Sequence, residues 1–219
     1  GKVQIGRNNI IREYVTINSA SSADKATILG DDNFLMAFSH IAHDCKIGNK
    51  VVICNGVLFA GFGEVQDGAF ISGDVVIHQF VRIGQLTIIS GLARINQDVP
   101  PFMMAVGDSR IWGLNLIGLR RAGFNRKDIK QIREAYNFIY RKGLPLKKAL
   151  AELEKIESDK VKEMIVFILS SMRGICGPQK GSFFERLFLD YPYFLRSKIP
   201  TNDLFLKSKQ ATSQLKESV

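Results

Sequence analysis

Apolar residues recur at every sixth position through the first half of the chain, between residues 29 and 95. An α-helix repeats every 3.6 residues and a flat strand every two, so neither explains a period of six. A sustained hexad is typical of a parallel β-helix, in which each hexad forms one side of a triangular coil. The apolar steps are Leu29, Leu35, Ile41, Ile47, Ile53, Phe59, Val65, Ile71, Ile77, Ile83, Ile89 and Ile95.

A second set of positions has the same period. Small or β-branched residues lie two before each apolar step, from Thr27 to Ala93, as a tight coil corner requires. Gly30, Gly48 and Gly84 directly follow a step, and we expect them at turns with positive φ. Because three hexads close one coil, residues eighteen apart are predicted to stack at the strand spacing of about 4.8 Å.

Polar and proline-containing stretches divide the chain into parts. The β-helix is predicted over residues 1–101, with a protruding loop over 18–28 that is rich in Ser and Ala. It ends at Pro100-Pro101, because prolines cannot donate to a strand ladder. A connector follows over 102–124. The first residues are already in the hexad phase without the polar cap of a terminal coil, so we expect that an N-terminal portion is missing.

A small helical domain is predicted over residues 125–180. Asn125 is placed to cap its first helix, with Asp128 in the first turn. Further helices are expected over 146–156 and 161–172. Residues 181–219 form a basic and aromatic extension with a polar tail. Its aromatic residues suit either a membrane or partner surface or a helix packed on the domain.

Composition narrows the class of protein. Of 219 residues, 46% are hydrophobic and 23% charged, which is ordinary for a soluble protein, and no apolar run is long enough for a transmembrane segment. Cys45, Cys54 and Cys176 lack metal-type spacing and indicate a reducing compartment, the cytoplasm. The net charge of +9 predicts an acidic partner, but no RNA-binding motif or groove-reading helix supports nucleic acid.

All three histidines, His40, His43 and His78, lie in the repeat. His43 comes two residues after an apolar step, so its side chain is expected to point outward. Its stacking column continues to Gly61 and then Gln79, which brings His78 to the same edge two coils away. This edge suits acyl transfer, with a histidine as general base and a backbone N–H stabilising the oxyanion.

Zinc bound by the three histidines, as in a hydratase, is the competing chemistry. Left-handed β-helix carbonic anhydrases carry a His-x4-His pair. Five residues after His78 the chain has Ile83 instead, which weakens the metal interpretation.

Four motifs together resemble one family. They are HIAHDC (40–45), IHQF (77–80), QDVPP (97–101) and NLIGLRRAGF (115–124), in order on the hexad background. The sequence resembles the bacterial acyl-[acyl-carrier-protein]–UDP-N-acetylglucosamine O-acyltransferases from about Gly1 to Gly174. The resemblance implies a homotrimer of left-handed β-helices, each followed by a small helical domain, with active sites between subunits. The implied reaction is the first step of lipid A synthesis, in the cytoplasm.

That reaction transfers a 3-hydroxyacyl chain from acyl carrier protein to the 3-hydroxyl of UDP-N-acetylglucosamine. The acyl carrier protein thioester is the co-substrate, and no cofactor or metal is expected. By position, the resemblance implies that His43 is the general base, that Asp44 helps to orient it, and that Gly61 supplies the oxyanion N–H. Implied substrate contacts are His40, His78, Gln79, Asn115 and Arg121, with Gly91 as the acyl-length ruler.

The sequence departs from the family at three places. Phe62 replaces another active-site histidine, Ala122 replaces the second arginine of a pair, and Ile117 replaces an acidic residue near the nucleoside. Two alternatives therefore stay open: an N-acyltransferase acting on a 3-amino sugar nucleotide, and a scaffold that has lost activity.

The net positive charge fits the implied partner. Acyl carrier protein is strongly acidic, and a basic edge beside the site would steer its approach. The candidates are Arg82, Arg94, Arg110, Arg120, Arg126 and Lys127.

Overall fold

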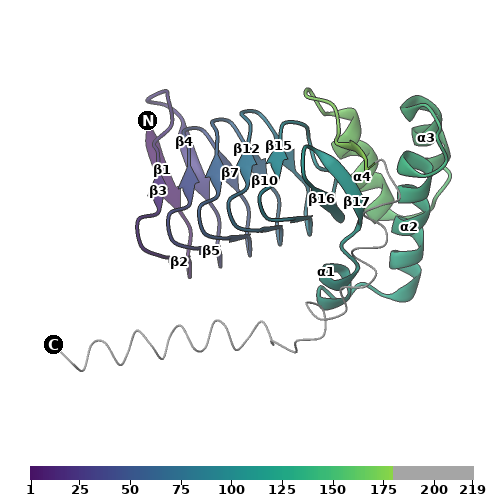
Figure 1. Ribbon diagram of the computed structural model, residues 1–219, viewed down its shortest axis with the longest axis horizontal. Coiled ribbons are helices and arrows are strands. Elements are labelled where there is room, and N and C mark those ends of the chain that lie inside the picture. The colour runs from purple at the N-terminus through teal and green to yellow at the C-terminus, as the bar shows by residue number, and fades with distance from the viewer. Residues whose placement is uncertain (180–219) are drawn as a thin grey trace. The chain divides into compact units, whose positions relative to one another are not determined.

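The computed structural model describes residues 1–179, and the extension predicted over 181–219 lies outside these residues. The chain winds in coils of short strands, and these strands form three sheets. Successive coils stack along one axis (Figure 1). Sheet A contains β1 (Lys2–Ile5), β4 (Ala26–Leu29), β7 (Lys46–Ile47), β10 (Glu64–Val65) and β13 (Arg82–Ile83). Sheet C contains β3 (Thr16–Ile17), β6 (His40–Ile41), β9 (Leu58–Phe59), β12 (Val76–Ile77) and β15 (Arg94–Ile95).

Sheet B continues beyond the solenoid. Its coil strands are β2 (Ile10–Ile11), β5 (Phe34–Leu35), β8 (Val52–Ile53), β11 (Phe70–Ile71) and β14 (Ile88–Ile89). Three later strands, β16 (Met103–Val106), β17 (Arg110–Leu114) and β18 (Gly177–Pro178), extend it. The predicted fold class is confirmed: the chain is mainly β, a left-handed parallel β-helix followed by a small helical domain.

The hexad periodicity is explained by the coil interior. Each apolar step from Leu29 to Ile95 is at most 3% exposed, and residues eighteen apart pair in register, as Lys46, Glu64 and Arg82 do. The positions two before each step are buried as well. They form a second inner layer, so their small size follows from the limited space inside a coil.

The corners depart from the glycine prediction. Gly30, Gly48 and Gly84 do not have positive φ; that conformation occurs three residues after the steps from Leu29 to Ile89, at Gly56 and Gly68 but otherwise at non-glycine residues such as Asp32 (φ 58°) and Asp44 (φ 60°). Steric reasons place glycine at the other positions: a Cβ on Gly84 would lie 2.3 Å from the nitrogen of Pro101. Close approach of the next coil therefore selects these glycines.

The loop predicted over 18–28 is shorter than expected, because β4 already begins at Ala26. We call residues 18–25 the corner loop, since they connect β3 to β4 at the corner between sheets C and A. They increase the sequence separation between stacked residues of the first two coils to twenty-four, as the pairing of Lys2 with Ala26 shows. The following coils return to eighteen.

Pro100-Pro101 does not end the sheet, contrary to the prediction. Val99 bridges to Ile83 in a further, shortened coil, and β16 pairs with β14. The prolines lie in the turn between these pairings, where no ladder donor is needed. Half of the predicted connector over 102–124 is thus the antiparallel hairpin of β16 and β17.

Four helices follow among the described residues. They are α1 (Leu116–Arg121), α2 (Arg126–Tyr140), α3 (Leu146–Leu153) and α4 (Asp159–Leu169). The Asn125 cap of α2 is confirmed, and it forms a reciprocal capping box with Asp128. The two later helices are each shorter than predicted. In residues 1–179, none of these helices has the length and hydrophobicity needed to span a membrane.

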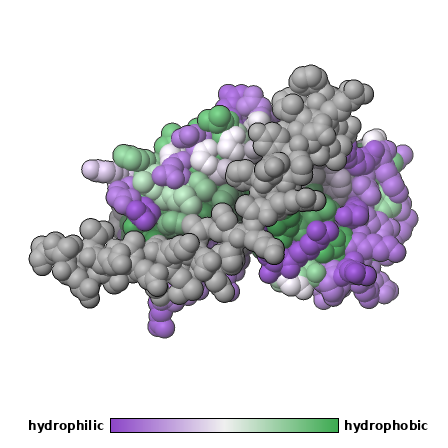
Figure 2. Space-filling view, turned by 60° about the horizontal axis from the view of Figure 1, so that its bottom comes forward, coloured by the Kyte–Doolittle hydropathy of each residue, from purple (hydrophilic) through white to green (hydrophobic). Residues whose placement is uncertain are grey.

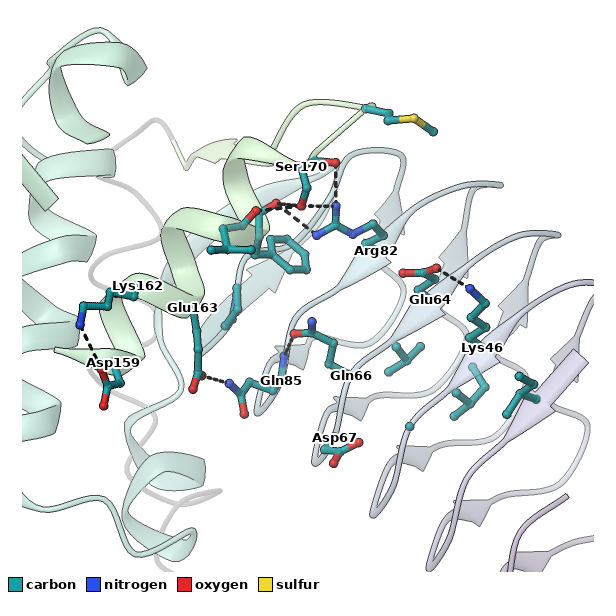
Figure 3. Close-up of a pocket in the computed structure, with 18 residues that line it drawn as sticks. Lys46, Glu64, Gln66, Asp67, Arg82, Gln85, Asp159, Lys162, Glu163 and Ser170 are labelled. Atoms are coloured by element: carbon teal, nitrogen blue, oxygen red, sulfur yellow. Dashed lines mark hydrogen bonds and ion pairs between the residues drawn. The ribbon is translucent and has the colours of Figure 1, made fainter. Parts of the chain in front are cut away.

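Arg82 fastens α4 to sheet A (Figure 3). Its guanidinium donates to the carbonyl oxygens of Ser170 (2.9 Å) and Phe167 (3.1 Å), at the C-terminus of the helix. It also lies 4.2 Å from the centre of the Phe167 ring. The guanidinium keeps its charge in these contacts but is largely engaged in holding the helix C-terminus, so its role in steering an acidic partner stays a prediction.

Candidate active site

His43 lies just after β6, at the corner where the chain leaves sheet C for sheet A. Its side chain is 46% exposed, so it points outward as predicted. Nδ1 lies 2.7 Å from Oδ2 of Asp44. With Nδ1–H donating to the carboxylate, Nε2 carries the lone pair and can accept a proton from a substrate.

Asp44 is the residue in positive φ at this corner, and only 5% of its side chain is exposed. Its backbone N–H donates to Oγ1 of Thr27 at 2.8 Å. The amide of Ser21 donates to Oδ2 at 3.0 Å. The hydrogen bond from His43 lowers the pKa of the Asp44 carboxyl, with a further contribution from Ser21, although desolvation opposes both. The carboxylate is thus held ionised beside the imidazole.

Gly61 lies one coil above His43, as the column of eighteen predicts. A Cβ there would lie 2.6 Å from Cε1 and 2.7 Å from Nε2 of His43, so only glycine leaves room for the ring. The amides of Ala60 and Phe62 donate to carbonyl oxygens of Ile77 and His43. Within residues 1–179, the amide of Gly61, a buried residue, has no hydrogen-bond acceptor.

The other histidines lie near the same corner. His78 directly follows β12, and its Nδ1 lies 3.3 Å from the carbonyl oxygen of Gln79. His40 is in β6, and its Nδ1 lies 2.7 Å from Oγ1 of Thr16. Strand β9 separates β6 from β12 in sheet C. The solenoid thus brings His40, His78 and Gln79 to the edge that also holds His43.

Phe62 and Phe80 form an aromatic stack beside His43. Their ring centres are 4.8 Å apart at 13°, and the Phe62 ring is perpendicular to His43 at 5.2 Å. Both phenylalanines have positive φ at this corner, eighteen residues apart. The stack gives His43 an apolar neighbour at the position where the resemblance expects another histidine.

Gly91, Asn115 and Arg121 do not join this corner. Gly91 follows β14, at the corner between sheets B and C. Asn115 caps α1: its side chain accepts from Gly118 N (3.0 Å) and donates to the carbonyl of Leu86 (2.8 Å). Arg121 is exposed in the last turn of that helix. Through these two hydrogen bonds, Asn115 joins the N-terminus of α1, the helix that carries Arg121, to Leu86 in the solenoid.

The histidine edge is not a ready metal site within one chain. Across residues 1–179, no group of three or more His, Cys, Asp or Glu side chains could hold a metal ion. Burial raises the pKa of Cys45 and Cys54 to about 11 and that of Cys176 to about 12. These thiols remain protonated at neutral pH and are poor ligands and nucleophiles.

A separate groove of about 1160 Å³ lies between the outer face of sheet A and α4 (Figure 3). Several of its charged groups pair with one another: Lys46 lies 3.4 Å from Glu64, and Lys162 lies 3.2 Å from Asp159. The described residues that line it include none of the predicted catalytic ones.

Sequence reasoning missed three contributors to the corner. Ser21 and Thr27 reach Asp44 through the corner loop and the inner layer, and no periodicity reveals such contacts. Phe80 could have been found, because it lies in the column of Phe62.

Known proteins share both parts of the chain. Residues 26–61 match the family described as bacterial transferase hexapeptide (six repeats). Residues 98–176 match Udp N-acetylglucosamine O-acyltransferase; Domain 2.

Three curated relatives are acyl-[acyl-carrier-protein]–UDP-N-acetylglucosamine O-acyltransferases. That of Gloeothece citriformis is 49% identical, over 70% of this chain and 56% of its own length. That of Campylobacter concisus is 43% identical, over 79% and 67%. That of Burkholderia lata is 41% identical, over 80% and 70%. The chain spans little more than half the length of the first of these relatives.

Solved structures agree in fold. UDP-N-acetylglucosamine acyltransferase from Francisella novicida has a TM-score of 0.78 and 37% identity, over 81% of this chain and 67% of that one. The enzyme from Arabidopsis has a TM-score of 0.76 and 39% identity, over 80% and 65%. The similarity extends over both the solenoid and the helices.

Proposed function

This chain belongs to the acyl-[acyl-carrier-protein]–UDP-N-acetylglucosamine O-acyltransferase family, and from that membership we propose its reaction. It transfers a 3-hydroxyacyl chain from acyl carrier protein to the 3-hydroxyl of UDP-N-acetylglucosamine, in the cytoplasm, as the first step of lipid A biosynthesis. The observation that carries the proposal is the His43–Asp44 pair, 2.7 Å apart, beside Gly61, whose amide has no acceptor within residues 1–179.

The proposed chemistry starts at Nε2 of His43. This nitrogen takes the proton from the sugar hydroxyl as the oxygen attacks the thioester carbonyl. Asp44 keeps Nδ1 protonated and stabilises the imidazolium that forms. The Gly61 N–H donates to the tetrahedral oxyanion. When the intermediate collapses, the C–S bond breaks and His43 returns the proton to the thiolate of the carrier.

Substrate contacts follow from the same placement. His78 and Gln79, above Gly61 in the solenoid, contact the sugar or diphosphate, as does His40 on sheet C. Arg121 binds a phosphate through a charge-assisted hydrogen bond, and Asn115 keeps its helix in place. The reaction needs no metal or other cofactor, because general base, oxyanion donor and activated acyl group are all supplied by protein and thioester.

A homotrimer is part of the proposal. His43 and Gly91 lie at different corners of one solenoid, so a neighbouring copy can present its own Gly91 to this His43, with the acyl chain held between the two copies. The outer face of sheet B supports this, with Phe34, Val52, Phe70 and Ile88 aligned in register. Figure 2, in which this side comes forward, shows apolar surface on the solenoid. A closed threefold ring would give three equivalent shared sites.

The proposed acidic partner is acyl carrier protein. Arg120, Arg126 and Lys127 are exposed on α1 and α2, and they can steer it electrostatically. Arg94 and Arg110 are exposed too, but Arg94 pairs with Asp108 at 2.9 Å.

An acyl-transfer assay tests the reaction. Carrier proteins loaded with 3-hydroxyacyl chains of several lengths are paired with the hydroxyl and the 3-amino sugar nucleotides. O-acylation by the parent, lowered about 10²–10⁴-fold in kcat by His43→Ala, is the expected result. Acylation of the amino sugar alone would establish the N-acyltransferase instead. Nucleotide binding without turnover would identify an inactive scaffold.

A further inference from the structure

The corner loop is the one interruption of the eighteen-residue period between β1 and β15. The three pairings that span it, β1 with β4, β2 with β5 and β3 with β6, join residues twenty-four apart. The later pairings up to β15 join residues eighteen apart, as β4 with β7 and β12 with β15 do. The loop adds six residues and returns the chain to the same columns. Its position is specific: it enters sheet A at the corner that also holds the His43–Asp44 pair.

The corner loop is fastened at both ends. Ala20 is 4% exposed, and its amide donates to the carbonyl of Lys2 at 3.2 Å. The Lys25 amide donates to the carbonyl of Ser22 at 3.1 Å, which closes a β-turn. The Ser22 hydroxyl also contacts the Asp24 carboxylate. Ser21, between the two anchors, therefore has a defined position.

The Ser21 amide meets the same oxygen that accepts from His43. It donates to Oδ2 of Asp44 at 3.0 Å, and Nδ1 of His43 lies 2.7 Å from this atom. The other oxygen, Oδ1, is buried and has no partner among the described residues. Ser21 is thus the second of only two donors to this carboxylate in residues 1–179.

We propose that the corner loop is a positioning element for catalysis, in which the Ser21 amide holds the Asp44 carboxylate in the orientation that binds His43. This inference rests on the proposed function. Without the Ser21 amide, Oδ2 of Asp44 keeps a single hydrogen bond, the one from His43, and the carboxyl group can rotate about its terminal torsion. His43 then loses the partner that fixes its Nδ1–H tautomer.

Proline substitution tests the amide. Ser21→Pro removes the N–H together with the hydroxyl, which also lowers the pKa of Asp44, so Ser21→Ala, which removes the hydroxyl alone, gives the reference kcat for the loss of the N–H. Ala23→Pro places proline in the same loop, at the second position of the Ser22–Lys25 turn, where proline fits. Losing a hydrogen bond to a charged group predicts that Ser21→Pro lowers kcat by about 10- to 100-fold. The KM for the sugar nucleotide stays within about twofold, since the proposed loss is in positioning and not in uniform binding. Ala23→Pro retains the parent kcat.

A spectroscopic readout separates positioning from loss of folded protein. The chain has three histidines, so ¹⁵N-histidine spectra are simple, and His43→Gln assigns the signal of interest. The parent is expected to show the Nδ1–H tautomer of His43 with a downfield proton. Ser21→Pro should show a mixture of tautomers for His43 alone, at an unchanged melting temperature.

A measurement on the parent protein covers the case in which Ser21→Pro does not fold. Amide hydrogen exchange at Ser21 should be slower than at Ala23, and Asp44→Asn should accelerate it. Equal exchange at Ser21 and Ala23, or a folded Ser21→Pro with parent-like His43 signal and kcat, would overturn the inference. A parent that transfers no acyl group overturns the proposed function only, because the spectra still decide the role of Ser21.

Discussion

Two corners of the same solenoid share one backbone geometry but carry different side chains, which stabilise the fold at one corner and form the candidate active site at the other. At the corner from sheet A to sheet B, the side-chain oxygens of Asp31, Asn49 and Asp67, each two residues after a step, accept from an amide of the neighbouring coil. Asp31 N–H donates to Asn49 Oδ1 and Asn49 N–H to Asp67 Oδ1, both at 2.8 Å. At the corner from sheet C to sheet A, the equivalent positions are His43 and Gly61.

The difference shows how a repeat protein can acquire a site without changing its fold. A side-chain ladder satisfies the amides of the first corner and stabilises it. The second corner gives up that ladder, so the Gly61 amide is left without an acceptor in residues 1–179, and a histidine takes the space of an amide or carboxylate. Stability and chemistry are thus assigned to separate corners, and substitutions at each should affect one property and leave the other.

Among the substitutions that test this comparison, Gly61→Ala should have the largest effect. A methyl group 2.6 Å from the His43 ring must displace it, and we expect kcat to fall about 10²-fold or more, as for loss of a general base. Steady-state kinetics measure the loss. Gly113→Ala is the matched control, because a Cβ there meets nothing within 4 Å. Parent-like activity of Gly61→Ala would show that the ring position is unimportant.

Asp44→Asn should have the next largest effect. Asparagine tolerates positive φ, but it weakens the charge-assisted bond to His43, so we expect a loss of roughly 10- to 100-fold in kcat. Asp32→Asn is the control, since Asp32 has nearly the same φ at the ladder corner. Equal losses in the two variants would mean that the effect comes from the backbone.

Asn49→Ala should have the smallest effect on catalysis and a visible one on stability. The variant loses the acceptor for the Asp31 amide, and we expect the free energy of unfolding to fall by about 1 kcal/mol. Denaturant titration measures this change, while kcat should stay at the parent value. A fall in kcat with unchanged stability would erase the distinction between the corners.

How much the sequence predicts depends on whether a contact obeys the period. The inner layers, the column of His43 and Gly61, and the outward direction of His43 all follow from counting by six and eighteen. The strand after Pro100-Pro101 was missed, because sheet pairing resumes sixteen residues on, between Ile88 and Met104. The contact of Ser21 with Asp44 was equally hidden, since an irregular loop has no register to count.

Positive φ at the corners was predicted for the wrong residues, and the reason is physical. Glycine is needed where backbones approach closely, and that need outweighs its conformational freedom at Gly30 and Gly84. Most left-handed positions are not glycine and accept a side chain at a cost in free energy. Local propensity therefore named the correct residue type for these corners but not the correct position.

The left-handed residues have a consequence for engineering heat-resistant variants. Lys50 has φ 55° and an exposed side chain, and a left-handed conformation costs an ordinary L-residue about 1–2 kcal/mol. Replacing Lys50 with asparagine or glycine should relieve part of that strain, and the backbone N–H at this position would still donate to the Asp31 carbonyl. The same strained conformation recurs at successive coils along each edge of the solenoid, so several such replacements could be combined in one variant. Thermal unfolding of each single variant would measure the increase in melting temperature.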